Sequence, residues 1–169
     1  MAEQFLTLMA DLDDDSQQIM SEWYNTLKEV GFTGTQTPGL PYHISLATFL
    51  LEKEQEAVAL MQKVAAEFAP VSVHISHVGM FAGGKVLFGA PDMSPELTAL
   101  HDACASESAQ QYPWTPHATL LIDEPDIVSA AVPVLMKTFY PFVGKITRLH
   151  LCAFWPTREI AAVELKGND

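Results

Sequence analysis

The sequence has few basic residues, and this narrows the classes of ligand that the protein can be expected to bind. Of 169 residues, 9 are Lys or Arg and 21 are Asp or Glu, which gives a formal net charge of −12. Proteins that hold long nucleic acids do so through many Lys and Arg contacts to phosphates. Here the basic residues are scattered along the chain, and the average field would repel a polyanion. We therefore expect a small ligand, and a long nucleic acid is not expected as a partner.

Cysteines and long apolar runs are also scarce. Two cysteines, Cys104 and Cys152, are too few for a disulfide framework. No apolar run approaches the roughly 20 residues that span a bilayer, and the acidic start of the chain does not resemble a signal peptide. We expect a cytoplasmic protein with buried thiols and no membrane association. No pattern in the sequence predicts an oligomeric state.

Hydrophobic residues make up 49% of the chain, and their spacing predicts alternating helices and strands around a core. Strands are predicted at residues 5–10, 42–50, 71–81, 85–89, 117–122, 142–154 and 159–165. Helices are predicted at residues 16–30, 54–68, from Ser94–Pro95 to about Gln110, and at 126–138. Pro133 is expected to kink or shorten the last helix, and the glycines of AGG (82–84) to turn a hairpin.

The order of these elements repeats. The offset that carries His43 onto His117 also carries Val71 onto Lys145 and Phe81 onto Trp155. We predict an α+β fold in one bilobal domain over residues 1–169. This pseudo-duplicated fold has two mostly antiparallel sheets that face each other across a central cleft, with helices on the outside.

One short motif, His-x-hydroxyl-Leu, occurs twice, at residues 43–46 and 117–120. Side chains alternate between the two faces of a strand. Each motif therefore presents its imidazole and its hydroxyl on one face and its aliphatic pair on the other. If the two lobes face each other, both imidazoles and both hydroxyls converge in the cleft. The four residues are His43, Ser45, His117 and Thr119.

This combination suits the cleavage of a phosphodiester. A neutral imidazole can take a proton from the attacking water or hydroxyl, and a protonated one can give a proton to the leaving oxygen, because its pKa lies near neutrality. The hydroxyls of Ser45 and Thr119 can hydrogen-bond the non-bridging oxygens as charge builds there. The chemistry needs no metal and no other cofactor.

With these two motifs the sequence resembles the 2H phosphoesterase superfamily, whose mark is a pair of His-x-Ser/Thr-hydrophobic motifs in a bilobal fold. It is most similar to the branch called 2′-5′ RNA ligase-like or cyclic phosphodiesterase-like. The resemblance covers nearly the whole chain, including VGMFAGGKVLFGAP (78–91) and a terminal hairpin. It implies that His43 and His117 are the proton-transfer pair and that Ser45 and Thr119 orient the phosphate. It also implies substrates such as 2′,3′-cyclic phosphates, related nucleotide cyclic phosphates or 2′-5′ RNA linkages.

The chain departs from many members of this family at two points. Its second motif continues as TLLIDEP (119–125), where many members have a basic residue, and Leu50 follows Phe49, where many have a glycine. The missing basic residue and the acidic balance favour a small cyclic phosphate over RNA. We predict a metal-independent phosphoesterase that hydrolyses a small cyclic phosphodiester, such as a nucleoside 2′,3′-cyclic phosphate. The alternatives are 2′-5′ RNA ligase-like activity on RNA ends and a non-catalytic nucleotide-binding module.

Three further residues are expected to contact the substrate. Tyr42 stands next to the first motif, and Trp155 lies in step with Phe81 in the repeat. One of these aromatic side chains is expected to stack on a base. Lys85, in the predicted hairpin, is expected to reach a phosphate if the hairpin borders the cleft.

Two other patterns resemble metal sites, but each lacks a feature that such a site needs. The acidic segment DLDDDSQQIMSE (11–22) has the carboxylate spacing of a calcium-binding loop, but Ser16 stands where that loop needs glycine. We expect these acidic residues to complement a helix N-terminus instead. His74 and His77 lie three apart on a predicted strand, so we expect them to face opposite ways and not to share a metal.

Overall fold

The computed structural model describes residues 3–105, 108 and 113–167. Its strands are β1 (Phe5–Leu12), β2 (His43–Leu50), β3 (Val71–Met80), β4 (Val86–Pro91), β5 (Ala118–Ile122), β6 (Phe142–Phe154) and β7 (Arg158–Glu164). Its helices are α1 (Asp14–Glu29), α2 (Glu54–Glu67), α3 (Pro95–Ala105) and α4 (Pro125–Met136), with a short 3-10 turn at Leu51–Lys53. The strands and helices predicted from hydrophobic spacing are all present in the described part of the chain.

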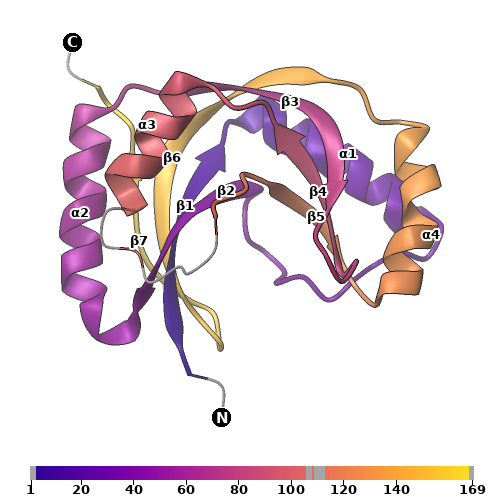
Figure 1. The fold of residues 1–169 in the computed structure, drawn as a ribbon, viewed down its shortest axis with the longest axis horizontal. Helices are drawn as coiled ribbons and strands as arrows, with labels where there is room; N and C mark the ends of the chain where they lie inside the picture. Colours follow the sequence, from indigo (N-terminus) through magenta and orange to yellow (C-terminus); the bar gives the residue numbers. More distant parts are fainter. Residues whose placement is uncertain (1–2, 106–107, 109–112, 168–169) are drawn as a thin grey trace.

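All the strands belong to one antiparallel sheet, in the order β2-β1-β6-β3-β4-β5, with β7 also paired to β6. Strand β6 pairs with β3 through residues 142–146 and with β1 through residues 146–154. The predicted α+β fold with antiparallel strands is confirmed, and its two halves share β6 as a common strand (Figure 1). The sheet curves until β2 and β5, which are at opposite ends of this order, contact each other.

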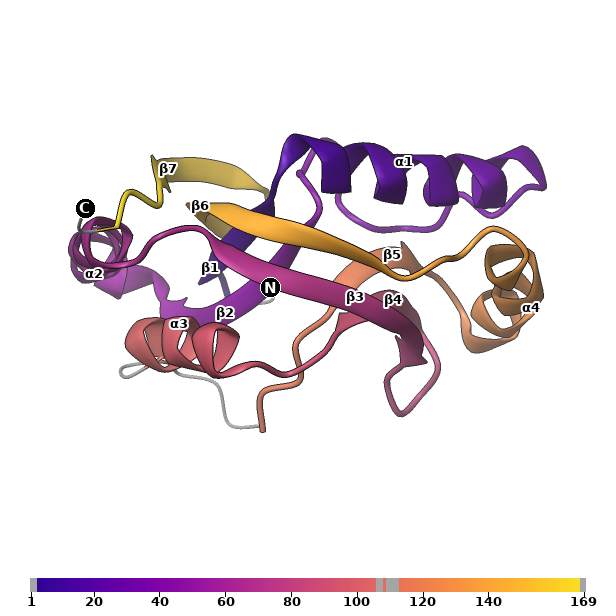
Figure 2. The ribbon, with the colours of Figure 1, turned by 90° about the horizontal axis from the view of Figure 1, so that it is seen from above.

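The helices cover the two halves of the sheet in pairs. Helices α2 and α3 pack on the half that contains β1 and β2, whereas α1 and α4 contact each other and cover β4, β5 and the start of β6 (Figure 2). Helix α1 directly follows β1 along the chain, and α3 directly follows β4. Each of these helices therefore covers the half opposite to the strand that precedes it.

Helix α1 begins at an acidic cap. The carboxylate of Asp13 accepts a hydrogen bond from the backbone N of Ser16 at 3.2 Å, and the Ser16 hydroxyl also donates to it. Asp14 and Asp15 occupy the first turn, where negative charge is favourable. This confirms the prediction that the acidic segment complements a helix N-terminus. Trp23 lies on the buried face of this helix.

A serine and a proline that the sequence placed at helix positions can be located in the structure. Ser94 caps α3, since its hydroxyl accepts a hydrogen bond from the backbone N of Leu97 at 3.1 Å. The predicted end of this helix at Gln110 lies outside the described residues. Pro133 lies inside α4, yet the helix continues to Met136.

Both cysteines are buried, as expected, and neither forms a disulfide. Burial raises the pKa of Cys104 to about 12 and that of Cys152 to about 11, so both thiols stay protonated at neutral pH. Within the described residues, no helix is long and apolar enough to cross a bilayer.

Candidate active site

The two motif histidines are held in the same way on two strands that meet. His43 begins β2, and His117 directly precedes β5. The Nδ1 atom of His43 lies 2.7 Å from the carbonyl oxygen of Pro41, and that of His117 lies 2.8 Å from the carbonyl oxygen of Thr115. A carbonyl only accepts hydrogen bonds, so each Nδ1 carries a hydrogen. Each neutral ring therefore keeps Nε2 as the atom that can exchange a proton.

A cavity of about 810 Å³ opens beside these motifs. His43, Ser45 and Thr119 all line it, and its size falls within the range of small-molecule sites. The rest of the lining comes from β1, the ends of β5 and β6, one face of α1 and the loop at residues 33–42. Three of the four residues of the repeated motif thus border one space.

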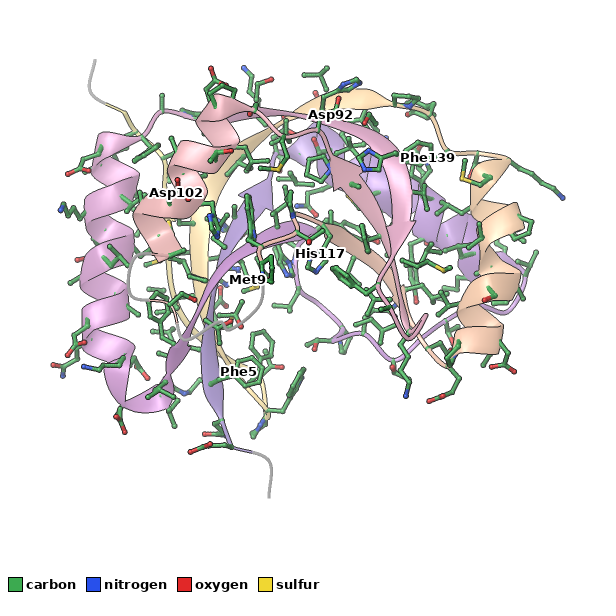
Figure 3. All side chains as sticks on the ribbon, viewed as in Figure 1. Phe5, Met9, Asp92, Asp102, His117 and Phe139 are labelled. Carbon is green, nitrogen blue, oxygen red and sulfur yellow. The ribbon has the colours of Figure 1, made fainter. Side chains whose placement is uncertain are left out.

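His117 is not among the described residues that line this cavity, and two phenylalanines contact its ring. Its ring meets Phe81 edge-on at a centroid distance of 4.7 Å and lies 5.3 Å from the ring of Phe88. Thr119, which shares a strand face with His117, lines the cavity, and the charge of His117 acts on the pKa of His43. In Figure 3, His117 lies toward the centre of the molecule, where the two halves of the sheet meet.

Burial shifts the pKa of both motif imidazoles. It lowers the pKa of His43 and the pKa of His117 below their ordinary values, and the hydrogen bonds to backbone carbonyls partly oppose this. The charge of Asp11 also raises the pKa of His43, whereas the charge of His117 lowers it further. At neutral pH both rings are therefore more strongly biased toward the neutral form than an imidazole in water.

Asp11 is a buried carboxylate beside the candidate site that the sequence patterns did not single out. It lies directly across from His43 in the pairing of β1 with β2, and its side chain is only 4% exposed. One carboxylate oxygen accepts hydrogen bonds from Arg148 at 2.9 and 2.6 Å and lies 3.3 Å from Nδ1 of His150. The other oxygen is buried and has no hydrogen-bond partner among the described residues. The signal in the sequence was a single carboxylate inside the otherwise apolar strand FLTLMADL (5–12).

The hydroxyls of the motifs are available to a ligand. Within the described part of the chain, neither Ser45 Oγ nor Thr119 Oγ1 has a hydrogen-bond partner. The backbone oxygen of Ser45 accepts a hydrogen bond from Trp114 Nε1 at 2.9 Å. Trp114 in turn stacks on His101 with ring centroids 3.9 Å apart. These contacts tie the segment before the second motif to the strand of the first motif.

The aromatic residues expected at the site both border the cavity. Tyr42 is half-buried there, and burial raises the pKa of its hydroxyl. Trp155 is 62% exposed, and its indole N donates a hydrogen bond to Thr37 Oγ1 at 3.2 Å. The ring of Phe5 meets Trp155 edge-on at 5.5 Å. Trp155 therefore presents a supported aromatic surface at the mouth of the cavity.

Lys85 does not lie where the sequence analysis expected it. It is absent from the residues that line the cavity, and its ammonium group lies 3.4 Å from a carboxylate oxygen of Glu124. The hairpin that carries Lys85 borders the site through Phe81 instead. The lysine that lines the cavity is Lys28, near the end of α1. No motif pointed to it, because its place in the lining depends on how α1 packs relative to the distant motif strands.

The prediction that His74 and His77 face opposite ways is wrong. A register shift between Ile75 and His77 in β3 turns both imidazoles toward Asp92. Their Nδ1 atoms lie 2.8 and 3.8 Å from its carboxylate oxygens. In the described ranges, no group of three or more His, Cys, Asp or Glu side chains is arranged to hold a metal ion.

Comparison with solved structures finds the same fold in proteins of low sequence identity. The apo structure of E. coli LigT has a TM-score of 0.66 and 20% identity, over 98% of this chain and 99% of that chain. LigT has also been solved with 3′-AMP and with phosphate. The protein TT0787 of Thermus thermophilus has a TM-score of 0.65 and 14% identity, over 98% of this chain and 100% of that chain.

Comparison with curated proteins finds no match. The model of the 2′-5′ RNA ligase superfamily, by contrast, matches residues 13–154, a range that contains both motifs and the strands from β2 to β6. The resemblance drawn from the two motifs is therefore confirmed, and this protein belongs to the 2′-5′ RNA ligase superfamily, a group of 2H phosphoesterases.

Proposed function

We propose that this protein hydrolyses a small cyclic phosphodiester, such as a nucleoside 2′,3′-cyclic phosphate, by acid–base catalysis without a metal. Members of its superfamily are enzymes. One observation carries the proposal: His43 and His117 lie where β2 and β5 meet, and each has Nδ1 bound to a carbonyl and Nε2 without a hydrogen-bond partner among the described residues. Two imidazoles in this state supply the base and the acid that the reaction needs.

The reaction balances with these two groups alone. One imidazole takes a proton from water as the water oxygen bonds to phosphorus. The bond from phosphorus to one ribose oxygen breaks, and the other imidazole, already protonated, gives its proton to that oxygen. The product is a nucleoside monophosphate with a free neighbouring hydroxyl. Ser45 and Thr119 donate hydrogen bonds to the non-bridging oxygens, where charge builds in the transition state.

The environment of the two histidines supports an assignment of roles. Asp11 lies across from His43 in the sheet and stabilises its protonated form. Among the described residues, no carboxylate acts in this way on His117, whose pKa is lowered by burial and raised by the hydrogen bond to the carbonyl of Thr115. We assign the proton donor to His43 and the base to His117.

The size and lining of the cavity support a nucleotide as the substrate. Trp155 offers an exposed indole on which a base can stack, and such stacking is worth roughly 1–3 kcal/mol. E. coli LigT, which shares the fold, has been solved with 3′-AMP, the type of product that opening a 2′,3′-cyclic phosphate would release.

Turnover of a substrate panel tests the proposal. The purified protein is incubated with each nucleoside 2′,3′-cyclic phosphate and with a 2′-5′ dinucleotide, and products are followed by phosphorus NMR. We expect the cyclic phosphate resonance to be replaced by that of a monoester, with the same rate in the presence of a strong chelator. An absence of turnover on the whole panel contradicts the enzyme proposal, and loss of activity with chelator contradicts the metal-independent mechanism.

The same panel separates the alternatives. Ligation would join an RNA that ends in a 2′,3′-cyclic phosphate to one that begins with a 5′-hydroxyl, and the longer product is visible on a gel. A non-catalytic module would bind 3′-AMP in calorimetry while every cyclic substrate stays intact.

A further inference from the structure

The cavity does not end at the catalytic motifs but continues toward α1. Ser21, Tyr24 and Lys28 line this extension. Their spacing of three and four residues places them on one face of the helix. Lys28 is in the last turn of α1 and is exposed at the rim. The extension therefore ends beside a lysine ammonium group.

The charge of this lining is unlike that of the rest of the protein. The chain carries 21 acidic residues, but no Asp or Glu is among the described residues that line the cavity. Lys28 is the one Lys or Arg in that lining. It forms no ion pair with a described residue, whereas Lys85 and Arg158 are paired with Glu124 and Glu54. Lys28 is thus a cation without a described ion-pair partner, and no described Asp or Glu lines the cavity beside it.

The wall opposite α1 is a loop fixed at several points. The hydroxyl of Tyr24 donates to the carbonyl oxygen of Thr33 at 2.9 Å. The loop also pairs with the end of β5, since Thr35 N donates to Ile122 O at 2.6 Å and Ile122 N donates to Gln36 Oε1 at 3.1 Å. The space between the loop and α1 is consequently preformed rather than created by a ligand.

The aromatic surface and the cation come from two different segments that line this space. Trp155 belongs to the turn between β6 and β7, and Lys28 to the end of α1. Figure 1 shows the turn between β6 and β7 below the place where β2 and β5 meet, and the end of α1 to the right of it. A ligand centred at the motifs can therefore extend in one direction onto Trp155 and in the other toward Lys28.

We propose that Lys28 binds a second phosphate group of the substrate, so that the preferred substrate is a cyclic nucleotide with a further phosphate, such as a 5′-phosphorylated nucleoside 2′,3′-cyclic phosphate. This inference rests on the proposed function for the position of the cyclic phosphate. In such a nucleotide, the base and the 5′-phosphate leave the ribose in different directions, as the positions of Trp155 and Lys28 require. Lys28 then selects among substrates without taking part in the chemistry.

The test compares adenosine 2′,3′-cyclic phosphate with its 5′-phosphorylated form. We expect the wild type to prefer the phosphorylated substrate in kcat/KM. Lys28→Gln should remove roughly two- to fivefold of that preference, the size expected for an exposed charge pair, and should lower kcat/KM for the unphosphorylated substrate less. Lys28→Glu should reverse the preference. Lys63→Gln, at an exposed lysine of α2 outside the cavity, is the matched control.

Binding separates failure of this inference from failure of the proposed function. Calorimetry with adenosine 3′,5′-bisphosphate and with 3′-AMP needs no turnover. If no cyclic substrate reacts but Lys28→Gln weakens the binding of the bisphosphate and not that of 3′-AMP, the second-phosphate site is supported and the proposed function is wrong. If Lys28→Gln changes both ligands equally, or neither, the second-phosphate site is wrong, whatever the enzyme's activity.

Discussion

Asp11 and His43 face each other across the pairing of β1 with β2, and the buried carboxylate raises the pKa of the imidazole. The carboxylate has one oxygen committed to Arg148 and one without a partner among the described residues. Burial lowers the pKa of His43, and the negative charge of Asp11 opposes this in part. The charge of Asp11 acts on His43 and is not among the causes of the pKa shift of His117, so the two imidazoles have different electrostatic surroundings.

Asp11→Asn should make activity more sensitive to alkaline pH. Removing the charge lowers the pKa of His43, so the proton donor loses its proton at lower pH. The alkaline limb of the bell-shaped profile of kcat/KM should then move to lower pH. If instead the acidic limb moves, His43 is the base and the assigned roles are reversed. Asp14→Asn, at an exposed carboxylate of α1, should leave both limbs in place.

His43→Ala and His117→Ala should each lower kcat by on the order of 10²–10⁴, because each removes one proton-transfer group. Combining the two should cost less than the product of the single effects, since the groups act as a unit. His77→Ala, at an imidazole outside the cavity lining that is 59% exposed, is the control and should retain full activity. Full activity in either motif variant contradicts the proposed mechanism.

Both motif histidines should also make the fold less stable in acid. Burial lowers their pKa, so below their ordinary value of 6.5 the unfolded chain binds protons that the folded protein does not. The contribution of these two groups is therefore present above pH 6.5 and lost as the pH falls. Urea unfolding at several pH values measures this. The double variant His43→Asn, His117→Asn should show a weaker loss of stability on acidification than the wild type.

Phe81→Ala should reduce kcat more than it raises KM. The ring of Phe81 meets His117 edge-on, and such ring contacts contribute about 1 kcal/mol, so we expect roughly a fivefold loss as the imidazole becomes less well held. Phe81→Leu keeps an apolar side chain there and should recover part of the rate. A change in KM alone would show that Phe81 contacts the substrate rather than orienting His117.

Trp155→Ala should weaken nucleotide binding with little effect on stability, because the indole is 62% exposed. Loss of a stacked base predicts a rise in KM of roughly 5- to 100-fold. A cyclic phosphate of a sugar that lacks a base should show no difference between wild type and variant. An equal loss on both substrates contradicts the stacking role.

The elements that sequence reasoning could recover are those set by local patterns. Alternation and helical spacing located the strands and helices, and the repeated motif singled out His43 and His117, whose roles remain a prediction. Asp11 and Lys28 were missed because their roles depend on contacts between distant segments, namely strand register and the packing of α1 relative to the motif strands. Lys85 is paired with Glu124 and does not line the cavity, which also depends on how distant segments are brought together.

Strand register also explains the error at His77. The alternation rule assumes an unbroken ladder, but β3 gains a residue between Ile75 and His77 relative to β4. Such bulges reverse the faces of all later side chains. Nothing in the segment VHISHVG (73–79) distinguishes it from a regular strand.

The shared strand β6 limits how this molecule can move. Its first residues pair with β3 and its later residues with β1, so swinging the halves apart would break backbone hydrogen bonds in the middle of the sheet. Helices α1 and α3 also connect the two halves, because each follows a strand of one half and packs on the other half. We therefore expect the width of the cavity beside the motifs to change little when a ligand enters. We also expect that neither half of the sheet folds when it is expressed as a separate fragment.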